Sequence, residues 1–107
     1  MDFDLKNLFE TAQKVQSEMA RVKEELAQKT VEGEAGGGLV RCVANGKGEV
    51  VALEIDPSLM NAAQKKLLEE LLAGAVNVAL DRVRDLAQSE MARATGGLPI
   101  PPGLMGG

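Results

Sequence analysis

The residue types that most often carry out catalysis are scarce in this sequence. It contains no histidine, the commonest general base and metal ligand in proteins, and its one cysteine is Cys42. A single thiol excludes a disulfide within the chain and any site with several thiolate ligands. Cys42 lies on the apolar face of a predicted strand, so we interpret it as a buried structural thiol. The sequence therefore predicts no catalytic residues and no metal site.

Two short motifs suggest phosphate or cation binding, and neither is sufficient. Gly46-Lys47 resembles part of a phosphate loop, but the Walker pattern needs glycine at position 41 and serine or threonine at position 48. The chain has Arg41 and Gly48 there. Glu54 and Asp56 could bind a cation, but a strand-end charge and a helix N-cap are the favoured interpretation. We therefore predict that the protein is not an enzyme and has no cofactor and no small-molecule substrate.

The remaining chemistry belongs to positive side chains on two long helical segments. Such side chains can bind the phosphates of a nucleic acid. The candidates for DNA binding are Lys6, Lys14, Arg21, Lys23, Arg82, Arg84 and Arg93. Lys14 and Arg21 share a helix face, as do Arg82 and Arg93. The competing interpretation is a solvated face, because basic and acidic residues alternate every four positions from Lys6 to Glu18, and such a ladder of ion pairs is favoured residue by residue.

The composition indicates one small folded domain with an acidic balance. The chain has 107 residues, of which 45% are hydrophobic, and its aromatic residues are Phe3 and Phe9. Its 12 basic and 16 acidic residues give a net charge of -4, which argues against a generally basic nucleic-acid-binding protein. The first residues lack the apolar core of a signal peptide, and no apolar run approaches membrane-spanning length. We therefore expect a cytoplasmic protein with no membrane partner.

The spacing of apolar residues predicts the two helices that carry these charges. Steps of three and four residues predict a first helix from about Asp4 to Lys29. Its seam is Leu5, Leu8, Ala12, Val15, Met19, Val22 and Leu26. A second helix is predicted from about Asn61 to Ala94. Its first half is apolar over a wide arc and should pack on a sheet, whereas its second half has a narrow apolar stripe typical of a projecting arm.

Residues 36–59 predict a β-hairpin that leads into a helix start. Asn45-Gly46 is a turn dipeptide that supplies positive φ angles. Asp56 is a good N-cap, followed by proline at the first helical position. Residues 30–34 predict a further strand antiparallel to the hairpin. Alternation predicts a core face with the members Val40, Cys42, Ala44, Val51, Leu53 and Ile55.

The predicted fold class is α+β, with the order α-β-β-β-α, a small antiparallel sheet and two long helices. A sheet with strands of about six residues is only about 20 Å long, so both helices exceed it. Their apolar seams cannot all be buried in one copy, and a second copy about a two-fold axis is the simplest partner. We therefore expect a homodimer with helical arms. Residues 1–95 should form one domain, and residues 96–107 a flexible Gly/Pro tail.

Several motifs resemble the YbaB/EbfC family of small bacterial nucleoid-associated proteins. They are Gly36-Gly37-Gly38-Leu39-Val40, the Asn45-Gly46 turn, the run from Glu54 to Leu59, Ala12-Gln13, Met19 and Glu24-Glu25 of the first helix, and the Pro-Pro-Gly end of Leu98 to Gly103. The resemblance covers nearly the whole chain. It implies a tweezers-like dimer whose arms bind double-stranded DNA, and roles in nucleoid organisation and gene regulation.

The sequence thus favours a nucleoid-associated protein that binds double-stranded DNA through phosphate contacts and groove shape, with weak sequence preference. No aromatic stacking platform for single strands is present. The alternative is a dimeric protein-interaction scaffold without direct nucleic-acid binding, which the sequence pI of about 4.8 favours. The expected location is the cytoplasm, at the nucleoid.

Overall fold

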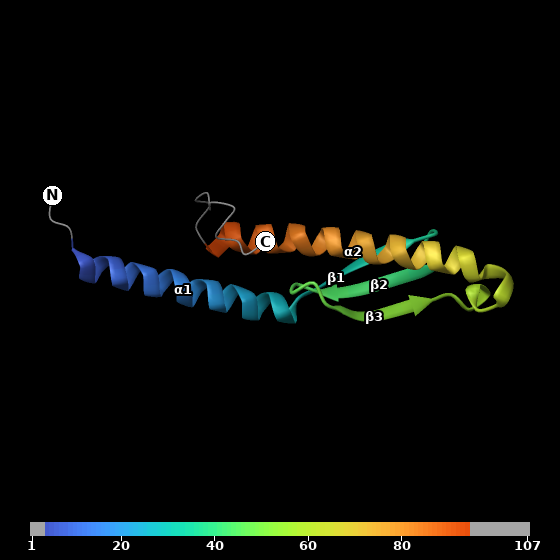
Figure 1. Cartoon of the computed structure of the whole chain (residues 1–107), viewed down its shortest axis with the longest axis horizontal. Coiled ribbons are helices and arrows are strands. Elements are labelled where there is room, and N and C mark those ends of the chain that lie inside the picture. Colours follow the sequence, from blue (N-terminus) through green and yellow to red (C-terminus); the bar gives the residue numbers. More distant parts are fainter. Residues whose placement is uncertain (1–3, 95–107) are drawn as a thin grey trace.

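The computed structural model describes residues 4–94 as an elongated body of 73 × 20 × 18 Å (Figure 1). A long helix leads into a three-stranded sheet, and a second long helix returns along the sheet and then beside the first helix. The elements are α1 (Leu5–Gln28), β1 (Thr30–Ala35), β2 (Val40–Asn45), β3 (Val50–Ile55), two short 3-10 helices (Pro57–Leu59 and Ala62–Gln64) and α2 (Lys65–Ala94). The predicted α+β class and element order are confirmed.

The sheet is antiparallel in the order β1-β2-β3. Cys42 lies between Gly33 of β1 and Leu53 of β3, so these three residues share one face. A bulge follows Val43, because the next residue of β2 pairs with Val50 and not with Val51. The predicted strand at 30–34 is confirmed and extends by one residue.

The hairpin turn differs from its prediction. The positive φ angle belongs to Gly48, at +83°, and neither Asn45 nor Gly46 has one. Asn45 instead closes the turn with its side chain, whose Oδ1 accepts hydrogen bonds from the backbone N–H groups of Lys47 (2.9 Å) and Glu49 (3.1 Å). In this four-residue turn the residue with a left-handed backbone is Gly48, at the end of the turn. The prediction that Asn45-Gly46 supplies the positive φ angles is therefore wrong.

Gly46 has a different role, at the end of α1. Its N–H donates to the carbonyl oxygens of Leu26 (2.8 Å) and Lys29 (3.0 Å), so the hairpin turn caps the last turn of the helix. A Cβ at position 46 would lie 2.4 Å from the Leu26 carbonyl oxygen, which leaves room only for glycine. The turn therefore fixes the direction in which α1 leaves the sheet.

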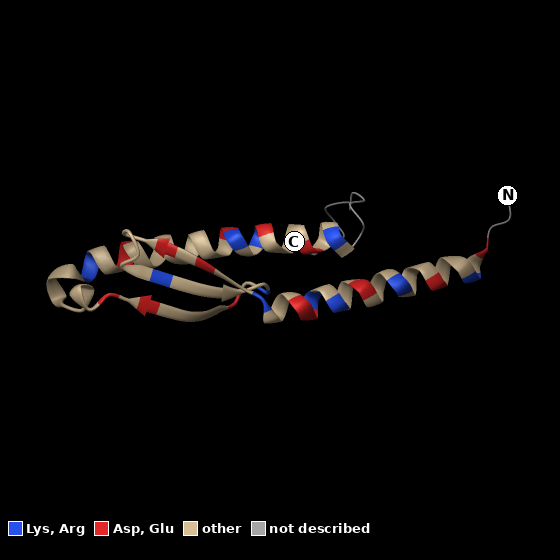
Figure 2. Ribbon diagram, turned by 180° about the vertical axis from the view of Figure 1, so that it is seen from behind, with Lys and Arg blue, Asp and Glu red and all other residues tan. Residues whose placement is uncertain are grey.

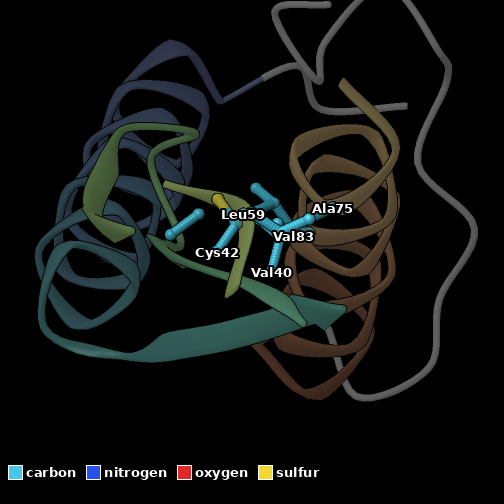
Figure 3. Close-up of a cluster of buried hydrophobic side chains, with 7 residues drawn as sticks. Val40, Cys42, Leu59, Ala75 and Val83 are labelled. Carbon is cyan, nitrogen blue, oxygen red and sulfur yellow. The ribbon is translucent and has the colours of Figure 1, made fainter. Parts of the chain in front are cut away.

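The main core lies between α2 and the face of β1 and β2 (Figure 3). Its buried residues are Val40, Cys42, Ala44, Leu59, Ala75, Ala79 and Val83. Cys42 is fully buried as predicted, and this burial raises the pKa of its thiol. Helix and sheet approach very closely at Gly33, where a Cβ would lie 2.3 Å from the Ala75 carbonyl oxygen. α2 also packs on β1 at Gly74, where an added Cβ would lie 3.4 Å from the Cβ of Ala35.

Within one chain, the predicted core face is wrong for Val51 and Leu53 of β3, whereas Ile55 is partly buried against the main core as predicted. Val51 is 54% exposed and Leu53 is 47% exposed, although Leu53 lies on the same face as the buried Cys42. The reason is that α2 packs across β1 and β2 and leaves the third strand uncovered. We call the exposed set Val50, Val51 and Leu53 the β3 apolar surface.

The second half of α2 packs against α1 rather than projecting alone. Val22, Leu26 and Met91 form a separate buried cluster between the two helices. α1 continues beyond the end of α2, so its first half is the free arm (Figure 1). α2 also begins at Lys65 rather than at the predicted Asn61, whose side chain caps the preceding 3-10 turn by accepting from the Gln64 N–H (3.2 Å).

Candidate nucleic-acid interface

Basic and acidic positions are interspersed along both helices, as the ribbon colours show (Figure 2). Within Leu5–Gln28, the four basic residues Lys6, Lys14, Arg21 and Lys23 are balanced by four acidic residues, Glu10, Glu18, Glu24 and Glu25. The helix as a whole is therefore neutral. Any attraction for phosphate depends on which positive groups are already engaged by carboxylates.

The arginine candidates are engaged with other groups of the chain. Arg21 pairs with Glu18 and Glu25, and these carboxylates raise the pKa of its guanidinium further. Arg84 pairs with Asp81. Both arginines therefore form ion pairs with carboxylates of their own helix.

Two further arginines make contacts that the sequence did not indicate. Arg93 pairs with the buried carboxylate of Glu90. Arg82 donates to the backbone carbonyl of Glu32 and so connects α2 to the edge strand β1. Their spacing of eleven residues suggested a shared face, but each has a structural partner of its own.

Three of the candidates, Lys6, Lys14 and Lys23, have no carboxylate partner among residues 4–94. Within residues 4–94, the ion pairs include none of these three lysines. The predicted ladder from Lys6 to Glu18 is therefore wrong at its lysines. All three are exposed on α1, and Lys6 and Lys14 lie on its free half.

A buried carboxylate between the helices was not identified from the sequence. Glu90 of α2 is 6% exposed at its side chain and accepts from Lys29, at the end of α1, and from Arg93. The signal was present, because Glu90 follows Val83 by seven and Leu86 by four residues, which is the spacing of the apolar seam. An acidic residue at a seam position indicates a polar contact between helices. The pair Lys29–Glu90 therefore fixes the junction of the two arms.

Removing the negative charge of Glu90 should weaken the dependence of folding stability on acid pH. Lys29 and Arg93 lower the pKa of Glu90 from its ordinary value of 4.5. The unfolded chain therefore binds the proton first, so the stabilisation is present above a pH of about 4.5 and is lost as the pH falls through the folded pKa. We expect Glu90→Gln to lower the free energy of unfolding at neutral pH and to flatten its decline in acid, measured by urea unfolding over a pH series.

The exposed Glu69, which pairs with Lys65 on the same helix, provides the control. Glu69→Gln should change the free energy of unfolding little, because exposed ion pairs contribute little. An unchanged acid dependence in Glu90→Gln would contradict the role of the buried carboxylate.

The outer face of the sheet is an unsuitable surface for phosphate. Arg41 on the central strand is held by Glu32 of β1 and by Glu54 of β3, to which it donates at 2.9 and 3.0 Å. On this face two carboxylates surround one guanidinium, and Arg41 lowers the pKa of Glu54 below its ordinary value. This face is acidic, which leaves the helices as the surface for a polyanion.

The described residues offer few alternatives to a polyanion site. Across positions 4–94, no group of three or more His, Cys, Asp or Glu side chains is placed to hold a metal ion. Neither long helix combines the length and the apolar content that crossing a bilayer requires, over the part of the chain that the structure covers. The predicted tail at 96–107 lies outside the described residues.

The chain is similar to proteins from several bacteria. A nucleoid-associated protein of Thermoanaerobacter pseudethanolicus is 46% identical over 99 residues, which cover 92% of this chain and 89% of the relative. One from Anaeromyxobacter is 47% identical over 98 residues, covering 92% and 95%. The crystal structure of an uncharacterized protein from Helicobacter pylori superposes with a TM-score of 0.77 at 26% identity, covering 90% of this chain and 100% of that one.

Residues 1–98 also match the model of a protein family described as DNA-binding. This match covers most of the chain and confirms the resemblance inferred from the central motifs. It confirms DNA binding as the predicted function and indicates a DNA-binding protein rather than an enzyme. The chain belongs to the YbaB/EbfC DNA-binding family.

Proposed function

We propose that this chain is a nucleoid-associated protein of the bacterial cytoplasm that binds double-stranded DNA as a homodimer. The names of its relatives support the location at the nucleoid. The observation that carries the binding site is the set of exposed lysines on α1 without carboxylate partners among residues 4–94. A projecting helix with such residues brings positive charge to a duplex ahead of the acidic sheet.

The homodimer is supported by the β3 apolar surface. Three large apolar side chains on one short strand are each more than 40% exposed, namely Val50 (43%), Val51 (54%) and Leu53 (47%). Exposed apolar patches of this kind usually mark an interface. A second copy is the partner that a self-complementary patch accommodates at the least cost, through a two-fold axis. The axis doubles the number of arms and of lysines.

The candidate residues contribute unequally in this proposal. Lys6, Lys14 and Lys23 contact phosphates directly, since no ion pair within the described chain has to break first. Arg21, Arg84 and Arg93 contribute less, because a phosphate must compete with their carboxylates. Arg82 acts mainly by holding α2 to the sheet.

Recognition of a duplex should depend on its backbone and shape. Phosphate contacts position a protein but carry no direct sequence information. The described chain contains one aromatic residue, Phe9, so it lacks the series of rings on which single-stranded bases stack. We therefore infer weak sequence preference and an effect on DNA conformation through the placing of two sets of arms.

A salt series with a lysine variant tests this proposal. Duplex affinity of the unmodified dimer should fall steeply with salt, and Lys6→Gln with Lys14→Gln and Lys23→Gln should reduce the slope of log K against log salt. Two copies of three contacts correspond to a slope change of up to about 5, at about 0.9 per phosphate. Gel shift or fluorescence anisotropy measures both quantities.

Lys66 provides the matched control, because it is an exposed lysine at the start of α2, beyond the sheet and away from the free arm. Lys66→Gln should leave the slope unchanged. A salt response that is flat for the unmodified protein would rule out the phosphate mechanism. Absence of duplex binding by the intact dimer would favour the protein-interaction scaffold, which the neutral charge of α1 makes the second candidate.

A further inference from the structure

The free half of α1 carries an apolar stripe that the described chain leaves uncovered. We define the free stripe as Leu5, Leu8, Phe9, Ala12 and Val15. Leu5 is 61% exposed and Phe9 is 70% exposed. At about 100° per residue, the stripe lies on the same side of the helix as the buried Val22 and Leu26. The free stripe therefore continues the apolar seam of α1, and α2 covers this seam only up to the point where α2 ends.

The residues that follow α2 in the sequence start at one end of this stripe. Ala94 packs against the cluster of Val22, Leu26 and Met91, so the chain leaves α2 while still in contact with α1. Residues 95–107 contain no charged side chain. They contain three prolines and the apolar residues Leu98, Ile100, Leu104 and Met105. An uncharged segment of this composition matches an apolar surface rather than a phosphate-binding one.

The lengths of the two segments agree. From Val22 to Leu5 the helix rises about 26 Å, at about 1.5 Å per residue. In an extended polyproline conformation, residues 98–105 span about 25 Å, at about 3.1 Å per residue. Gly96 and Gly97 precede them and allow the chain to change direction after the helix. The apolar part of the segment can therefore reach every residue of the free stripe.

We propose that residues 98–105 lie in extended form along the free stripe of their own chain, antiparallel to α1. Prolines favour an extended backbone before binding, which lowers the entropic cost of docking, and proline rings pack well on an aromatic side chain such as Phe9. The tether makes this docking intramolecular, with an effective concentration in the millimolar range. The free stripe of a second copy is a weaker competitor, since the pair would form a coiled coil of fewer than about two heptads.

Cysteine pairs in the full-length protein test this placement. Ala12→Cys with Ile100→Cys joins the stripe to the segment, and Asn7→Cys with Ile100→Cys is the control, since Asn7 lies on the far side of α1. Cys42 is buried and stays out of the reaction. The first pair should form a disulfide within one chain several-fold faster than the control, seen as a change of mobility on a non-reducing gel. Equal rates, or disulfides only between two chains, would overturn the proposal.

A second measurement uses no cysteine. Leu98→Asp with Ile100→Asp should release the segment and raise the binding of the dye anilinonaphthalene sulfonate, which reports exposed apolar surface. Gly106→Asp with Gly107→Asp adds the same charge beyond the docked part and should leave dye binding unchanged. Unchanged dye binding in the first variant contradicts docking. Neither experiment contains DNA, so its result is independent of duplex binding.

Discussion

Gly33→Ala is expected to be among the most damaging single changes in the chain, although it adds only one methyl group. The new Cβ would lie 2.3 Å from the Ala75 carbonyl oxygen and 2.4 Å from the Ala79 backbone nitrogen. Both neighbours belong to the backbone of α2, so no side chain can rotate out of the way. Helix and sheet would have to separate, which costs about 3 kcal/mol or more in free energy of unfolding. Urea unfolding measures the loss.

Gly74→Ala is the matched control, since it adds the same methyl group on the other side of this contact. Its Cβ would lie 3.4 Å from the Cβ of Ala35, an ordinary packing distance, and alanine favours the helix by about 1 kcal/mol over glycine. The variant should therefore be as stable as the unmodified chain or more stable by up to about 1 kcal/mol. Equal losses at positions 33 and 74 would contradict the close backbone approach.

Leu53→Asp should convert the proposed dimer into a folded monomer. Leu53 is 47% exposed in the single chain, so the change removes little packing within the chain but places a charge on the β3 apolar surface. Sedimentation at micromolar concentration should show a single subunit with unchanged circular dichroism. Duplex affinity should fall by a factor of about 100 or more, because one protomer loses the second set of arms.

Ala52→Asp controls for the added charge, because Ala52 is an exposed neighbour on the opposite face of the same strand. It should leave both the dimer and duplex affinity nearly unchanged. If the unmodified protein itself sediments as a folded single subunit, the dimer is wrong, and the proposed doubling of the arms is wrong with it. Full duplex affinity in a monomeric Leu53→Asp would separate DNA binding from dimerisation.

Local features of the fold were predicted closely because they depend on neighbours in sequence. The predicted first helix, from Asp4 to Lys29, has Asp4 and Lys29 as its two caps in the structure. Asp56 accepts from the Ser58 N–H (2.9 Å) as an N-cap should. The hairpin was placed correctly although its left-handed residue was not, since several turn types satisfy the same alternation. Capping and periodicity need only a few adjacent residues, and those are visible in one sequence.

The candidate site was predicted less well, because ion pairs depend on side-chain partners that spacing leaves open. Arg21 has two acidic neighbours within one helical turn, and it uses both. Lys14 stands four residues from Glu10 and from Glu18, yet no ion pair forms among them. Flexible lysine chains gain little from exposed pairs. Sequence spacing therefore predicts which ion pairs are possible but does not predict which of them form.

The sequence by itself determined the family, the order of elements and the absence of histidine and thiolate chemistry, because these follow from residue identity and local pattern. Only the tertiary structure decided that α2 covers two strands and leaves the third exposed, that Glu90 closes the junction of the helices, and that the first half of α1 extends beyond the end of α2. Each of these depends on where two distant segments meet. That position is set by close packing at Gly33 and Gly46, where a missing Cβ lets one backbone touch another.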